Sequence, residues 1–236
     1  MFWNSVIEGL KVLGHWQVWV AIGIYIIADL AFLMIFGGIL NSRYGANSKV
    51  MVAGCLSQFV GGLVLQGVLM ALLVLFLLPI LLGGESTMPA DKLLKFIWPL
   101  AKIGVVTIVI VTLLCFIPIA GQLLAQSPGI QGFLEGVIIF RILSNQIIAE
   151  TLSQNGISSV SVYPGFWASV GFLLMAGILV RLVMFLVALT FGQLENENIR
   201  EWTTITVGPA LGLLGGIIPL FMYCSYVSNS VMNAIR

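Results

Sequence analysis

Long uninterrupted runs of apolar residues dominate the chain, and polar residues gather in short stretches between them. A helix needs about 20 mostly apolar residues to cross the roughly 30 Å hydrocarbon core of a bilayer, because each residue rises about 1.5 Å. Five stretches reach that length, and we predict a spanning helix in each. They lie at about 17–40, 60–83, 98–124, 166–191 and 204–227. The predicted fold class is therefore all-α, a polytopic transmembrane helix bundle forming a single membrane domain over 1–236.

The first fifteen residues show a shorter amphipathic pattern. Apolar side chains recur at helical spacing along one side, and polar side chains fill the other. The apolar set is Trp3, Val6, Ile7, Leu10 and Leu13, and the polar set is Asn4, Ser5, Glu8 and Lys11. This pattern is typical of a helix that lies in the membrane interface, so we predict such a helix over 2–15. Trp16 and Trp19 then mark the headgroup boundary of the first span.

The apolar run at 50–83 is longer than one crossing requires. A single helix over all of it would be about 51 Å long. We predict one long span over about 60–83, preceded by a helical extension at the interface. A re-entrant hairpin is the alternative.

Residues 126–164 form the longest stretch for which no span is predicted. Its apolar part, 133–143, is too short to cross a bilayer and carries Glu135 and Arg141. The sequence therefore favours a re-entrant or interfacial helix near 133–149. Glu135 and Arg141 are candidate gate residues on such a helix, or solvated interfacial residues whose long side chains reach water.

Composition makes lipid the expected solvent of this surface. Of the 236 residues, 60% are hydrophobic and 8% are charged, and the mean hydropathy is +1.11. A soluble domain carries roughly 45–50% apolar and 25% charged residues. The formal net charge of +1 offers no electrostatic footprint for nucleic acid. The expected partners are the lipid bilayer and other membrane protein subunits or a second copy of the chain.

Two charged residues fall near the middle of predicted spans. Asp29 lies in 17–40 and Arg181 in 166–191. An ionised side chain at that depth costs roughly 2.5–3.5 kcal/mol on insertion scales and normally faces a partner inside the bundle. We predict that Asp29 and Arg181 form an intramembrane pair. The pair would either line an ion or solute pathway, or fix helix register or a contact to another subunit.

Glycine recurs every four residues in the last predicted span, at Gly208, Gly212 and Gly216. That spacing makes a smooth groove along one helix face, which lets a neighbouring backbone approach closely. We interpret these positions as a packing face, inside the protein or against another subunit. Pro209 and Pro219 are predicted to interrupt this span, and Pro118 the span at 98–124. A broken glycine-rich helix that lines a substrate site is the alternative.

Nothing in the sequence resembles a catalytic or metal site. His15 is the only histidine, and the three cysteines form no CxxC pair. The nucleophile, metalloprotease and phosphate-loop motifs are missing. We therefore expect no enzymatic activity, no catalytic residue, no cofactor and no metal.

The expected function is that of a non-catalytic integral membrane subunit, packed into a larger assembly through glycine-rich helix faces. The alternative is a small transporter or channel that moves an ion or solute past Asp29 and Arg181. Short loops without N-x-S/T sites suit the bacterial inner membrane. A slight excess of Lys and Arg on the side of the membrane that holds the N-terminus favours a cytoplasmic N-terminus.

Overall fold

The computed structural model describes residues 2–43, 67–117, 128–158, 166–193 and 197–236. Within these ranges, many side chains in the second half of the first long helix and at the beginning of two others lie outside the description. The described residues form helices joined by turns, and no strand occurs among them. The prediction of an all-α fold is confirmed.

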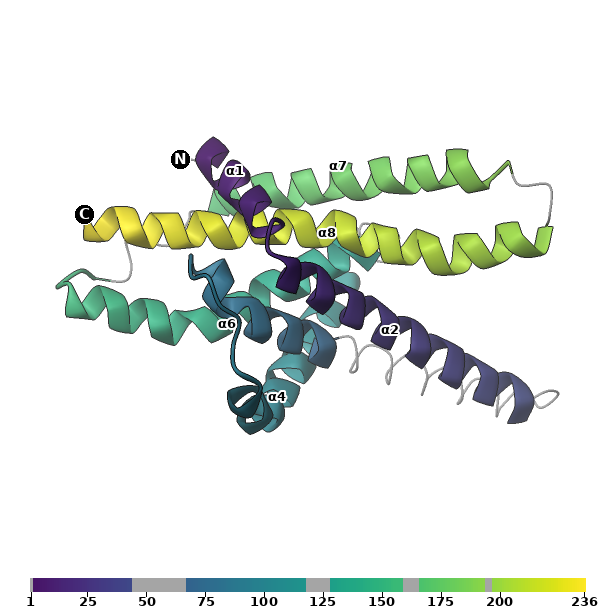
Figure 1. The fold of residues 1–236 in the computed structure, drawn as a ribbon, viewed down its shortest axis with the longest axis horizontal. Coiled ribbons are helices and arrows are strands. Elements are labelled where there is room, and N and C mark those ends of the chain that lie inside the picture. The colour runs from purple at the N-terminus through teal and green to yellow at the C-terminus, as the bar shows by residue number, and fades with distance from the viewer. Residues whose placement is uncertain (1, 44–66, 118–127, 159–165, 194–196) are drawn as a thin grey trace.

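Helix α8, Glu197–Ile235, is the centre of the arrangement. The long helices α6, Pro128–Gln154, and α7, Phe166–Phe191, pack along it, and the short helix α1, Phe2–Val12, crosses it (Figure 1). Accordingly, 72% of the residues in the apolar 18-residue stretch of α8 are buried, against 22% in that of α7. The core consists mainly of apolar side chains from α8 and from the helix Gly67–Leu81, with further members from α6, α7 and α2. The largest aromatic members that are fully buried are Phe133, Phe140, Phe172, Phe221 and Tyr223.

Three further helices complete the described chain. They are α2, Trp16–Arg43, an apolar helix at Gly67–Leu81, and α4, Ala90–Cys115. Side chains of the Gly67–Leu81 helix are largely buried in the same core. Helix α4 packs against α6, and α2 points away from the pair formed by α7 and α8 (Figure 1).

The described residues contain three helices that are long and apolar enough to cross a membrane. These are Gly129–Gln154, Trp167–Phe191 and Leu211–Ile235. A fourth crossing is possible by length and composition if α1 and α2, which meet at 76°, form one bent span. The protein is thus a helical protein with the elements of a membrane protein. The predicted number of about five spans is not confirmed.

Helix α6 is longer than the re-entrant or interfacial helix predicted near 133–149. It is one continuous helix of 27 residues, and Gly129–Gln154 is long and apolar enough to cross. The sequence predicted only the apolar part, 133–143, because polar residues lie on both sides of it. In the structure Glu135 is buried, and Arg141 donates a hydrogen bond to Tyr223. The helix continues through both residues.

Helix α8 is longer than the predicted span at 204–227. Its described backbone continues through Pro209 and Pro219 to Ile235, so the predicted interruptions are wrong. The polar residues after 227 stay helical because other elements bind their side chains. Ser228 Oγ donates to the Leu82 carbonyl at 3.2 Å, and Asn229 binds Ser5 and Glu8 of α1.

Helix α4 differs in its boundaries from the predicted span, and α7 and α2 agree closely with theirs. Helix α4 begins at Ala90 after Pro89 at the N-cap, eight residues before the predicted span at 98–124, and Pro99 lies inside it. Helices α7 and α2 coincide with the predicted spans at 166–191 and 17–40 within a few residues. Residues 50–66, the first half of the possible hairpin, and the break at Pro118 lie outside the described residues.

Candidate functional site

Glu135 places a carboxyl group inside the bundle. The side chain is fully buried on α6, and its Oε1 accepts a hydrogen bond of 2.9 Å from Gln131 Nε2, one helical turn earlier. A buried carboxyl group requires such donors, since burial removes it from water. The sequence predicted Glu135 as a gate or an interfacial residue, and the structure places it in the interior.

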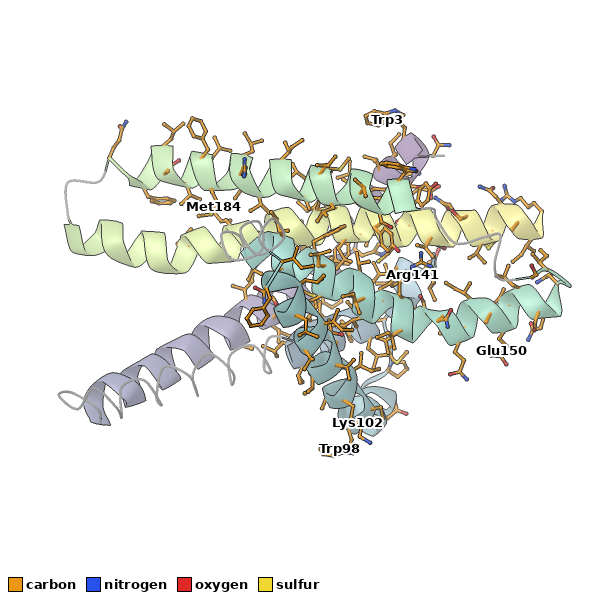
Figure 2. All side chains as sticks on the ribbon, turned by 180° about the vertical axis from the view of Figure 1, so that it is seen from behind. Trp3, Trp98, Lys102, Arg141, Glu150 and Met184 are labelled. Carbon is orange, nitrogen blue, oxygen red and sulfur yellow. The ribbon has the colours of Figure 1, made fainter. Side chains whose placement is uncertain are left out.

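Arg141 connects α6 to α8. Its Nε donates a hydrogen bond of 2.7 Å to the hydroxyl oxygen of Tyr223, and its guanidinium carbon lies 5.9 Å from the centre of the same ring. Figure 2 shows Arg141 between the ribbons of α6 and α8. The Phe172 ring of α7 meets Tyr223 edge-on, with the ring centres 6.0 Å apart. One arginine, one tyrosine and one phenylalanine therefore join the three candidate spans.

Two hydroxyl groups are buried on α4 and α6. Thr107 of α4 and Ser144 of α6 are both fully buried, and no hydrogen-bond partner is present for either oxygen among the described residues. The protein interior next to α4 and α6 thus contains polar groups, unlike a surface that faces lipid.

The glycines of α8 lie at two helix crossings. A Cβ atom at Gly216 would collide with the backbone carbonyl of Gly129 on α6, and one at Gly215 would lie 3.0 Å from Val180 Cα on α7. A Cβ atom at Gly212 would lie 3.5 Å from Met184 Sδ. Figure 2 marks Met184 on α7 near α8. The structure therefore uses Gly212 and Gly216 for contacts inside this chain. The surroundings of Gly208 lie outside the described residues.

Helix α1 is attached to α8 through its polar side. Ser5 is fully buried, Asn229 Nδ2 lies 3.4 Å from Ser5 Oγ, and Asn229 also donates to Glu8 Oε2. Gly9 lies so close to Met222 that a Cβ would be 2.5 Å from the Met222 Cα. The outward side of α1 is apolar, with Trp3 73% exposed (Figure 2). The predicted helix is present, but part of its polar face binds protein.

The predicted pair of Asp29 and Arg181 stays a prediction. The side chain of Asp29 lies outside the described residues. Arg181 is exposed on α7, and none of the side chains that the structure describes bonds to it. Figure 1 shows α8 between α7 and α2, the helix that carries position 29.

Several residues of this region were not singled out from the sequence. They are Gln131, Tyr223, Gly129 and Asn229. A sequence signal existed for one of them, because Gly129, Gly132 and Gly136 follow the small-residue spacing that is typical of close helix packing. Tyr223 and Asn229 gave no such signal, since single polar residues at the end of an apolar run are common.

No cluster of three His, Cys, Asp or Glu side chains that could hold a metal occurs within the described ranges. No protein-family model, curated protein or solved structure matches the chain. The fold and the contacts above therefore define the protein as an all-helical protein with helices suited to cross a membrane.

Proposed function

We propose that this chain is a non-catalytic subunit of a larger membrane protein assembly. The observation that carries the proposal is Arg181. The middle of Trp167–Phe191 is position 179, so Arg181 lies about 3 Å from it along the helix axis. The side chain is nevertheless exposed on the surface of this chain.

Lipid is a poor environment for this arginine. A guanidinium group at mid-membrane costs roughly 2.5–3.5 kcal/mol on insertion scales, and such groups normally face protein or water. Helix α7 is the most apolar of the three candidate spans and the least buried. A second protein chain on this surface would cover both the arginine and its apolar neighbours.

The close glycine contacts of α8 hold α6, α7 and α8 together within this chain. Gly212, Gly215 and Gly216 are covered by α6 and α7 of the same chain, so the assembly face lies elsewhere than in the sequence-based proposal. The outward side of α7 is the surface with the strongest reason to be covered.

Native mass spectrometry of the protein taken from its own membrane in mild detergent tests this proposal. We expect an unrelated membrane chain at fixed stoichiometry. A monodisperse particle that contains this chain alone would contradict the proposal.

A second candidate function is a small transporter or channel, which the buried polar groups of α6 favour. Glu135 and Gln131 lie inside the candidate span Gly129–Gln154, and intramembrane carboxyl groups commonly serve proton or ion paths. Flux measurements in liposomes would test it, with Glu135→Gln as the variant. Absence of flux with the wild-type chain would exclude this function for the chain alone.

A further inference from the structure

The outward face of α7 carries a regular seam. Trp167, Leu174, Ile178, Phe185 and Leu189 are all at least half exposed, and Arg181 is exposed among them. Ala188 is exposed as well, and the positions 174, 178, 181, 185 and 188 are separated by four, three, four and three residues. Alternation of three and four residues keeps one stripe of side chains facing a second helix along its length.

Arg181 occupies one position in this otherwise apolar seam. The α8 residues that face the neighbouring turns of α7 are uncharged glycines. Gly215 faces Val180, and Gly212 faces Met184. Within the described residues, nothing neutralises the arginine. A single polar position in an apolar helix seam is a known device for fixing register and partner, because a misaligned partner leaves the polar group unpaired.

We propose that the seam of α7 docks a transmembrane helix of another subunit that carries an aspartate or glutamate level with Arg181. The inference rests on the proposed function and adds the surface and the chemistry of the partner. An apolar helix covers the seam on both sides of the arginine. Its carboxylate accepts hydrogen bonds from the guanidinium group, which a bidentate geometry suits.

Photocrosslinking in the native membrane locates the partner. A photoreactive side chain is placed at position 178 or 185 of the seam, and at Leu186 as a control, which is 52% exposed but about 100° around the helix from Phe185. We expect positions 178 and 185, and not 186, to crosslink to one helix of a different subunit. That helix should contain an aspartate or glutamate.

Charge exchange then tests the pairing. We expect Arg181→Glu to reduce the recovered partner about tenfold or more, and Arg181→Lys to reduce it less. Replacing the partner's carboxylate with arginine should restore the complex with Arg181→Glu. Lys102→Glu, a charge reversal at an exposed position of α4, is the matched control and should leave the complex intact.

The outcomes separate the two proposals. If a partner subunit is present but Arg181→Glu retains it at the wild-type ratio, or the crosslinked helix lacks a carboxylate, the seam proposal is wrong and the subunit function stands. Crosslinks only between two copies of this chain would also overturn the seam proposal. If no partner subunit exists at all, both proposals fall.

Discussion

Arg141 and Tyr223 form a hydrogen bond of 2.7 Å between side chains on α6 and α8, helices that are far apart in the sequence. The contact explains how a charged residue can lie within a helix otherwise suited to a membrane. The phenol oxygen supplies an acceptor, and the ring centre lies 5.9 Å from the guanidinium carbon. Both interactions stabilise a cation that lipid would not.

Removal of the Tyr223 hydroxyl tests this contact. We expect Tyr223→Phe to lower the free energy of unfolding by about 1–2 kcal/mol, because Arg141 loses its acceptor while the ring stays. Unfolding in mixed micelles, followed by circular dichroism, measures the change. Tyr226→Phe is the control, since Tyr226 meets the same Phe172 ring at 5.8 Å and no described residue bonds to its hydroxyl. Equal losses in both variants would show that the Arg141 bond contributes nothing.

The crossing of α6 and α8 requires glycine at position 216. We expect Gly216→Val to destabilise the protein by about 1–3 kcal/mol or more, since a Cβ there would collide with the Gly129 carbonyl, which cannot move without shifting α6. The same unfolding assay measures it. Gly23→Ala in α2 is the control, because a Cβ at that position meets nothing within 4 Å. A neutral Gly216→Val variant would contradict the described crossing.

Helix α1 should open more often when Asn229 is replaced. Asn229→Ala removes the bonds to Ser5 and Glu8, and a hydrogen bond to a charged group is worth about 1.5–3 kcal/mol. We expect cleavage by trypsin after Lys11 to become about tenfold faster, because opening of α1 becomes that much more frequent. The control is Asn233→Ala, one turn later at an exposed position. Unchanged cleavage in Asn229→Ala would argue against this attachment.

These contacts also explain which parts of the fold the sequence could predict. Helix α7 was predicted with its boundaries because almost every residue from Phe166 to Phe191 is apolar, so composition alone defines it. Helix α6 was not, because its polar residues find partners such as Tyr223 on α8, and such pairing depends on the tertiary fold. For the same reason the end of α8 could not be predicted, because Asn229 there binds α1.

The candidate site was only partly predictable. Glu135 and Arg141 drew attention as charges in an apolar segment, and Gly212 and Gly216 through their spacing. Their contacts with Gln131, Tyr223 and Gly129 could not be inferred, since one sequence does not indicate which helices are neighbours. The pair of Asp29 and Arg181 rested on charge and depth alone, and those quantities do not fix the distance between two helices.

Arg181→Leu in the purified chain distinguishes an internal pair from a docking site. If Arg181 serves another subunit, we expect the stability of the isolated chain to change by no more than about 0.5 kcal/mol or to increase. A buried pair with Asp29 predicts a loss of about 3–5 kcal/mol, because the aspartate would be left without its partner. Asp29→Asn should then be equally damaging, and the double variant no worse than either single one.

The central claim, that α7 crosses the bilayer, is tested most directly by the depth of its side chains. Spin labels at the exposed positions 174, 178, 182 and 189 of the purified chain in liposomes can be probed with oxygen and with a water-soluble nickel complex. The structure predicts that the ratio of oxygen to nickel collisions rises to a maximum near position 179 and falls toward both ends of the helix. A ratio that stays low and constant along α7, as on a helix in water, would contradict the account.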